Sequence, residues 1–145
     1  YDKKIYRNAF EASKYKKTEK KVLTEEQRYV LESLISNHKN GDKKPNLIRG
    51  VTGSGKTQVY LKLIDDALKP DRGIIVMIPE ISLTPQMLSL FYSRYGDKVA
   101  VFHSALSFGQ RLDEWKRVKN GDAHIAIGTR SAVFAPIPGA FAIIL

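Results

Sequence analysis

The sequence predicts an α/β protein in which helices cover both faces of a doubly wound, mostly parallel β-sheet, so that the chain forms three layers. Helical and strand-like patterns alternate from residue 22 onward with short connections, which is typical of this class. Residues 73–78 form an unbroken apolar run, as central parallel strands do. A glycine-rich loop at residues 50–57 joins a strand-like run to a helical one, in the order that phosphate-binding loops require.

The first predicted element is a helix. Thr24 is followed three residues later by Gln27, which is the pattern of a capping box at a helix start. The helix should run from about residue 25 to residues 40–41, where Asn and Gly end it. The apolar stripe that we expect on its inner side consists of Tyr29, Val30, Leu31, Leu34 and Ile35.

A short strand and a second helix should flank the glycine-rich loop. Residues 46–49 read as a short strand that leads into the loop. Residues 58–68 carry apolar side chains at helical spacing, and Pro70 and Gly73 should end that helix.

The second half of the chain is predicted to supply the rest of the sheet. We expect strands at residues 73–78, 98–102, 123–127 and 141–145, with helices between them at about 83–94 and 108–119. In the latter helix the charged residues should face outward, and Leu112, Trp115 and Val118 should face the core.

The glycine-rich loop has the chemistry of a triphosphate-binding site. Its eight residues are Gly50, Val51, Thr52, Gly53, Ser54, Gly55, Lys56 and Thr57. Glycines let successive backbone N–H groups surround phosphate oxygens, Lys56 brings a cation to the terminal phosphates, and the Thr57 hydroxyl can ligate Mg²⁺. We therefore predict that the chain binds ATP with Mg²⁺, and that Lys56 and Thr57 carry the catalytic chemistry of the loop.

Three further polar segments follow strands of the predicted sheet, at residues 79–86, 102–104 and 128–131. Ligands of open α/β sheets bind beyond the carboxyl ends of the strands, so these segments and the phosphate loop should share one edge. Because the polar segments are spread along that edge, they favour an extended polymer over a small molecule as the second ligand.

Composition limits the remaining possibilities. The chain has a formal net charge of +9. It has no cysteine, so it has neither a disulfide framework nor a thiolate metal site, and we expect a cytoplasmic protein. Residues 1–21 contain eight basic and three acidic residues with interleaved aromatics. This basic segment reads as a linker or tether, with contact to nucleic acid as the alternative. No apolar run approaches the roughly 20 residues of a membrane span.

Five motifs in order resemble the PriA family of primosomal replication-restart DNA helicases, which belong to helicase superfamily two. The motifs are the phosphate loop with residues 59–61, Pro-Glu-Ile-Ser-Leu-Thr-Pro-Gln at 79–86, His-Ser-Ala-Leu-Ser at 103–107, Arg-Leu-Asp-Glu-Trp at 111–115, and Gly-Thr-Arg-Ser-Ala-Val-Phe-Ala-Pro at 128–136. The resemblance runs from about residue 22 to the end. It implies that residues 22–145 are the first RecA-like ATP-binding lobe, incomplete at its carboxyl end, with the basic segment 1–21 before it.

The resemblance also implies an activity. Such proteins are ATP-dependent motors that move 3′ to 5′ on single-stranded DNA, unwind stalled replication forks and start primosome assembly. Their partners are single-stranded and forked DNA, primosome proteins and single-strand-binding proteins, and their zinc module has no ligands in this chain. In the family an Asp-Glu-Glu-His box would follow this sequence, so we expect an excerpt that lacks hydrolysis on its own.

Residue roles follow from the same resemblance. Gln27 is similar to the adenine-reading glutamine of superfamily-two helicases, with a surface glutamine in a capping turn as the alternative. Thr84 and Gln86 lie in one DNA-contact motif and Thr129 and Arg130 in a second, with helix capping and a surface ion pair as the respective alternatives.

Two other residues and three other functions stay in consideration. His103 has no catalytic partner set and reads as structural, and Glu80 reads as a nucleotide contact, a cap or an ion-pair partner. The competing functions are another superfamily-two translocase acting on RNA or duplex DNA, a small-molecule kinase with the same phosphate loop, and a non-enzymatic nucleotide-binding adaptor. The kinase would normally carry an arginine-rich lid, which the sequence does not show.

Overall fold

The computed structural model describes residues 21–145, so the predicted basic segment lies outside the described residues except for Lys21. The described chain divides into two compact units, residues 21–70 and Asp71–Leu145.

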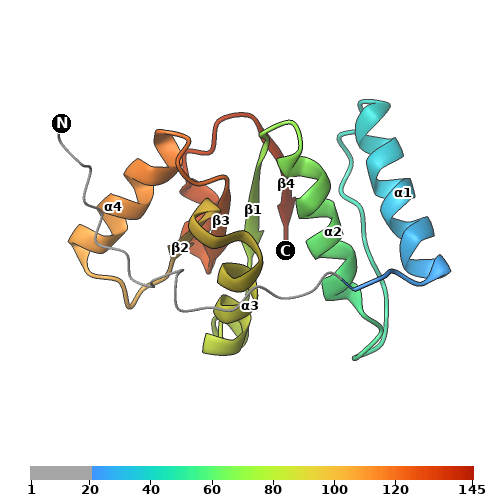
Figure 1. The fold of residues 1–145 in the computed structure, drawn as a ribbon, viewed down its shortest axis with the longest axis horizontal. Coiled ribbons are helices and arrows are strands. Elements are labelled where there is room, and N and C mark those ends of the chain that lie inside the picture. The colour runs from blue at the N-terminus through green and yellow to red at the C-terminus, as the bar shows by residue number, and fades with distance from the viewer. Residues whose placement is uncertain (1–20) are drawn as a thin grey trace. The chain divides into compact units, whose positions relative to one another are not determined.

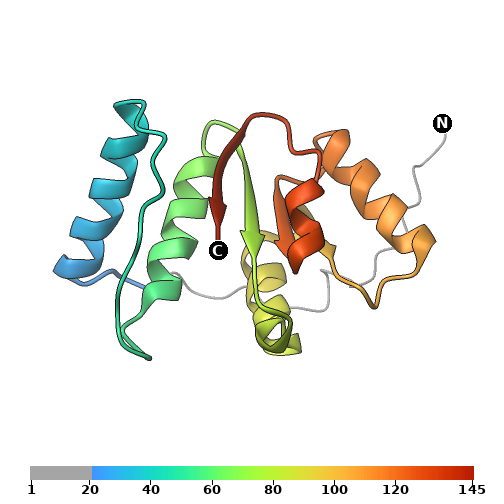
Figure 2. The same cartoon turned by 180° about the vertical axis from the view of Figure 1, so that it is seen from behind.

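The first unit contains two packed helices, α1 (Glu25–Lys39) and α2 (Lys56–Leu68), which lie side by side (Figures 1 and 2). The predicted capping box opens α1: the Thr24 hydroxyl accepts from the Gln27 N–H at 3.2 Å, and the Gln27 side-chain oxygen accepts from the Thr24 N–H at 3.1 Å. Of the predicted apolar stripe only Leu31 is buried, and Tyr29 is 75% exposed. The assignment of Tyr29 to the inner face was therefore wrong.

The strand predicted at residues 46–49 is not formed. These residues have no regular secondary structure, and Leu47 is 86% exposed. A strand exists only where its backbone N–H and C=O groups pair with a neighbour, and residues 21–70 contain no other strand. The apolar pattern was present in the sequence, but the hydrogen-bonding partner was not present in this unit.

The second unit is a four-stranded parallel sheet of β1 (Gly73–Met77), β2 (Val99–Phe102), β3 (Ile125–Gly128) and β4 (Ala140–Ile144). The order across the sheet is β2-β3-β1-β4, with β1 between β3 and β4. The first four residues of β1 are buried, as its unbroken apolar run predicted, and all residues of β2 and β3 are buried as well. The predicted α/β parallel fold is thereby confirmed, and strand boundaries differ from the prediction by two residues at most.

Helices flank this sheet. α3 (Pro85–Tyr95) connects β1 to β2, and α4 (Phe108–Lys119) connects β2 back to β3. The two connections run in opposite directions across the sheet, so right-handed crossovers place the helices on opposite faces. Figure 1 shows α3 on the near side of the strands. The face that holds α4 packs as one cluster, which consists of Ile75, Ala100, Phe102, Val118, Ala123, Ala126, Ala132 and Ala135.

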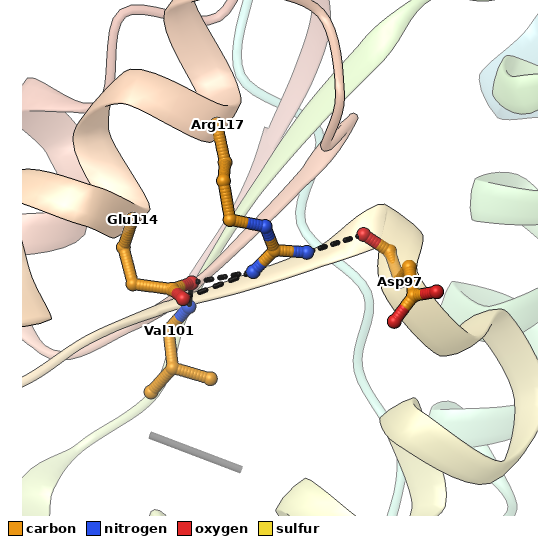
Figure 3. A network of polar contacts seen from close by, with 4 residues as sticks. All are labelled: Asp97, Val101, Glu114 and Arg117. Carbon is orange, nitrogen blue, oxygen red and sulfur yellow. Dashed lines mark hydrogen bonds and ion pairs between the residues drawn. The ribbon is translucent and has the colours of Figure 1, made fainter. Parts of the chain in front are cut away.

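A buried ion pair joins α4 to the edge strand β2 (Figure 3). Glu114 is 1% exposed, and its carboxylate accepts from the Val101 N–H at 2.9 Å. The Arg117 guanidinium donates to both carboxylate oxygens, at 2.9 and 3.1 Å, and to the Asp97 carbonyl. Burial raises the pKa of Glu114, and the nearby Arg117 charge opposes that rise only in part.

This pair corrects the predicted core of α4. Leu112 and Trp115, which we expected to face inward, are 40% and 37% exposed, and of the three predicted core residues only Val118 is buried. The physical reason is the edge of the sheet: the Val101 amide needs an acceptor, so the helix turns a carboxylate toward β2 instead of the tryptophan.

We predict that Glu114→Ala lowers the free energy of unfolding by about 3–5 kcal/mol, because it leaves the Arg117 guanidinium buried without its partner. Urea denaturation followed by circular dichroism measures this loss. Glu32→Ala, which removes an exposed helix carboxylate, is the matched control and should change stability by less than about 0.5 kcal/mol.

A double variant distinguishes the contribution of the Glu114–Arg117 ion pair from that of the hydrogen bond between Glu114 and the Val101 N–H. Glu114→Leu with Arg117→Leu removes both charges and leaves the buried Val101 amide without its acceptor and the exposed Asp97 carbonyl without its donor, so we expect a loss of about 1–3 kcal/mol. If the double variant were less stable than Glu114→Ala, the proposed origin of the loss would be incorrect.

Candidate functional site

The phosphate loop closes into a tight turn immediately before α2. Gly53 and Gly55 adopt left-handed φ angles of +82° and +80°, and the Ser54 N–H donates to the Val51 carbonyl at 3.1 Å. Gly55 is the residue that caps α2, so the helix begins at Lys56. Left-handed conformations are costly for residues with a Cβ, which explains why two glycines occupy these positions.

Close contacts fix two of the loop glycines. A Cβ added to Gly50 would lie 2.5 Å from the Ser54 hydroxyl oxygen, and one added to Gly55 would lie 2.2 Å from the Gln27 side-chain nitrogen. Both distances are far below van der Waals contact. A side chain at either position would therefore require the Ser54 or the Gln27 side chain to move from its present contact.

The start of α2 differs from the other α-helix starts in the described chain. Thr24, Thr84 and Ser107 cap α1, α3 and α4 by accepting from backbone N–H groups. α2 has no side-chain cap, and like α3 and α4 it has no acidic residue in its first turn. Because no side chain accepts from its first N–H groups, these groups and the positive end of the helix dipole suit an anion such as a phosphate. The residues present thus fit the triphosphate predicted from the sequence.

Lys56 and Thr57 are the first two residues of α2. The Lys56 ammonium donates to the Gly50 carbonyl and, at 3.3 Å, to the Val51 carbonyl. The side chain therefore lies across the loop, with its charge beside the same backbone that would contact a phosphate chain. Thr57 lies next along the helix and is partly buried.

Gln27 contacts the phosphate loop as well as capping α1. While its oxygen accepts from the Thr24 N–H, its nitrogen donates to the Ser54 carbonyl at 3.1 Å. Gln27 therefore lies in a capping turn, as the alternative interpretation proposed, and its side chain also forms a hydrogen bond to the phosphate loop. Contact with adenine stays a prediction. Sequence spacing gave no signal for the contact with Ser54, because it joins residues 27 positions apart.

The predicted DNA-contact residues occupy carboxyl-end loops of the second unit. Thr84 caps α3, since its hydroxyl accepts from the Met87 N–H at 3.3 Å, and Gln86 is exposed in the first turn. Met77 at the end of β1 pairs in register with Gly128 at the end of β3, so the loops that follow these strands leave one edge together.

Thr129 and Arg130 follow β3 at the same edge. Thr129 is 9% exposed, and its N–H donates to the Phe102 carbonyl at 3.1 Å, whereas Arg130 is exposed. The preceding glycine is required: a Cβ at Gly128 would lie 1.9 Å from the Phe102 carbonyl oxygen. This close approach aligns the ends of β2 and β3.

Two other loop residues have structural contacts. Glu80, in the short 3₁₀ helix η2 (Glu80–Ser82), accepts from the Ser104 hydroxyl at 3.4 Å and so connects the loops after β1 and β2. His103 accepts from the Ala105 N–H through Nδ1 at 3.1 Å. These contacts support the structural interpretation of both residues.

The described residues contain neither a metal-ligand cluster nor a helix that could span a membrane. Residues 21–145 contain no cluster of three or more His, Asp or Glu side chains that could hold a metal ion. Over the same residues, none of the helices has the length and apolar character needed to span a bilayer.

Comparison with known proteins agrees with these motifs. The family model described as "Type III restriction enzyme, res subunit" matches residues 20–141. The chain is similar to the replication restart protein PriA of Bacillus subtilis, with 44% identity over 132 residues, which is 91% of this chain and 16% of that protein.

Other relatives give the same result. The chain is 50% identical over 99 residues to PriA of Synechocystis, covering 68% of this chain and 12% of that protein. It is 39% identical over 122 residues to PriA of Treponema pallidum, covering 84% and 18% respectively. The chain therefore spans less than a fifth of the length of these curated relatives.

We predict that Gly55→Ala destabilises the first unit more than Gly41→Ala does. Both glycines have left-handed φ angles, so each alanine should cost about 1–2 kcal/mol of backbone strain. Only the Cβ at position 55 meets Gln27, whereas the Cβ at position 41 meets open space. Thermal unfolding measures the difference. In a Gln27→Ala background, which already lacks the Gln27 contacts, Gly55→Ala should cost no more than Gly41→Ala does. Equal effects of the two alanines would contradict this explanation of the loop.

We also predict an acid-dependent loss of stability that depends on His103. Burial lowers the pKa of His103 below its usual value of 6.5, and the Arg111 charge acts in the same direction. The unfolded chain therefore binds more protons than the folded chain as the pH falls below 6.5, so stability decreases on acidification. His103→Asn removes this titration, and urea unfolding between about pH 7 and 5 should show a flatter profile than for the unsubstituted chain. An identical profile would exclude His103 as the source.

Proposed function

The chain belongs to the family of the type III restriction enzyme res subunit, and on this premise we propose that residues 22–145 form the first ATP-binding lobe of a DNA helicase. In its complete form this motor would move 3′ to 5′, unwind stalled replication forks and initiate primosome assembly for replication restart. The similarity to proteins named replication restart protein PriA supports this assignment.

The observation that carries the ATP-binding part of the proposal is the open start of α2. It presents backbone N–H groups without a side-chain acceptor, and a lysine, where the other α-helices of the described chain have an oxygen cap. The backbone amides of residues 53 and 55–57 would bind phosphate oxygens, and the Lys56 side chain would neutralise charge on the terminal phosphates. The Thr57 hydroxyl would ligate Mg²⁺, which supplies additional positive charge to the phosphates when it is bound.

The loops after β1 and β3 support the DNA-binding part. Thr84, Gln86, Thr129 and Arg130 follow strands that are paired in register, so the two loops lie at neighbouring positions of one sheet edge. Hydroxyl, amide and guanidinium groups there would contact the phosphates and sugars of a single strand, and the capped start of α3 can still offer N–H groups.

Partners and cofactors follow from the same proposal. We propose ATP and Mg²⁺ as cofactors, single-stranded and forked DNA as substrates, and primosome and single-strand-binding proteins as partners of the complete protein in the cytoplasm. The basic segment 1–21 would act as a tether. Zinc, if the complete protein binds it, would need ligands beyond this chain, which has no cysteine.

We propose that the 145-residue chain binds ATP weakly and hydrolyses it negligibly by itself. Residues 21–145 contain no cluster of carboxylates that could hold Mg²⁺ together with Thr57 and orient a water molecule. Steady-state phosphate release from the isolated chain that increased with single-stranded DNA would contradict this statement.

We predict that Lys56→Ala weakens binding of ATP by roughly 10- to 150-fold, because it removes a charge-assisted contact of about 1.5–3 kcal/mol. Titration with a fluorescent ATP analogue in the presence of Mg²⁺ measures the change. Lys62→Ala, in the same helix, removes an equal charge and should leave the affinity nearly unchanged.

The complete protein provides a second measurement. There, Lys56→Ala should abolish DNA-stimulated ATP hydrolysis and leave binding to forked DNA largely intact. Continued turnover in this variant would refute the proposed role of Lys56.

A further inference from the structure

Helix α4 presents an apolar stripe to solvent. Phe108, Leu112 and Trp115 are 82%, 40% and 37% exposed, and they follow one another at four- and three-residue intervals. Residues at this spacing lie on one side of a helix. Large apolar residues that form such a surface indicate a binding site more often than solitary exposed ones do.

The orientation of this stripe is fixed by the opposite side of the helix. Glu114 and Val118 are buried together with Arg117, and they hold α4 against β2 and the Asp97 carbonyl. The helix start is fixed as well, because Ser107 and Gln110 form a reciprocal capping box. The exposed stripe is therefore a consequence of well-determined contacts.

Cations surround the stripe. Arg111, Lys116 and Lys119 are exposed on the same side of α4, and the Lys119 ammonium lies 4.8 Å from the centre of the Trp115 ring. No acidic residue of α4 is fully exposed beside them, since Asp113 is partly buried and Glu114 is buried. The surface thus combines two aromatic rings with three positive charges.

This charge pattern selects among possible occupants. A second copy of the same face would bring three cations against three cations, which disfavours self-association. Polyanions with flat aromatic groups satisfy both features, since bases stack on aromatic side chains and phosphates pair with lysine and arginine. An acidic peptide would satisfy the charges but would leave the aromatic rings without stacking partners.

We propose that the outer face of α4 is a binding site for single-stranded nucleic acid, in which Phe108 and Trp115 stack on bases and Arg111, Lys116 and Lys119 contact phosphates. The proposal rests on the proposed DNA-binding function and extends it to residues outside the loops after β1 and β3. Phe108 and Trp115 are seven residues apart, which corresponds to about 10 Å along the helix.

The site is continuous with the proposed DNA-contact edge. α4 begins directly after residues 103–107, the loop at the carboxyl end of β2, and the Arg111 guanidinium donates to the Leu106 carbonyl at 3.5 Å. A single strand of nucleic acid that crosses the loops after β1 and β3 could therefore continue past Ser104 to Phe108. The outer face of α4 would then bind the nucleic acid where it leaves the sheet beyond the edge strand β2.

Trp115 provides a direct readout, because it is the single tryptophan of the chain. The experiment titrates the 145-residue chain with a 20-nucleotide oligothymidylate at low salt and records tryptophan fluorescence together with fluorescence anisotropy of labelled oligonucleotide. We expect binding to quench Trp115 fluorescence, because a stacked base contacts the indole ring. A 20-residue polyglutamate peptide supplies comparable negative charge without bases and should not quench it.

Matched variants test the individual groups. Phe108→Ala should weaken oligothymidylate binding about 5- to 150-fold, whereas Tyr29→Ala, which removes an aromatic ring that is 75% exposed on α1, should not. Lys116→Gln with Lys119→Gln should lower the slope of log affinity against log salt by about 1.4, and Lys43→Gln with Lys44→Gln should not. Circular dichroism confirms that each variant is folded.

The outcomes separate this proposal from the proposed function. Oligothymidylate binding with unchanged tryptophan fluorescence and no effect of the α4 variants would overturn the site on α4 and leave DNA contact by the sheet-edge loops intact. Equal quenching by polyglutamate would overturn it in favour of an acidic peptide. If oligothymidylate did not bind at all, both DNA proposals would fail, while titration with the ATP analogue would still decide nucleotide binding.

Discussion

Backbone N–H groups that regular secondary structure leaves unpaired determine much of this structure. The first turn of every helix and the outer edge of every sheet have such groups, and burying them without an acceptor costs about 1–3 kcal/mol each. Thr24, Thr84 and Ser107 supply acceptors at three helix starts, and Glu114 supplies one at the edge of β2. The start of α2 has no such side-chain acceptor, and it is there that the sequence places its phosphate-binding pattern.

The same constraint explains which predictions from sequence succeeded. The predicted capping box at Thr24 involves residues three positions apart, so local pattern is sufficient to locate the start of α1. The box at Ser107, which was not predicted, has the same spacing. The strands β1 to β3 are predictable because burial on both faces leaves an unbroken apolar run. Residues 46–49, with Leu47 and Ile48 between two polar residues, also read as a short strand, but a local pattern does not include a partner strand, and residues 21–70 provide none.

The site was predictable to a similar extent. The order of glycine, lysine and threonine in the phosphate loop is local information, and the left-handed φ angles at Gly53 and Gly55 agree with the tight turn that the glycines were expected to allow. The contact between Gln27 and the Ser54 carbonyl depends on how α1 packs beside the loop, which no local pattern contains. This contact also explains why a Cβ at position 55 would displace a neighbour, since the Gln27 side chain occupies that space. One side chain therefore connects the start of α1 to the turn that precedes α2.

The rotation of α4 about its axis was not predictable, and the physical reason also accounts for its exposed face. Leu112 and Trp115 would bury more apolar area than Glu114 if they faced β2, but they offer no acceptor to the Val101 amide. A carboxylate at that position in turn requires Arg117 to balance its charge, and Arg117 reaches the Asp97 carbonyl as well. Once these two residues face the sheet, helical geometry turns Phe108, Leu112 and Trp115 outward. A need for one hydrogen bond at the sheet edge thus places an aromatic and cationic surface on the outside of the molecule.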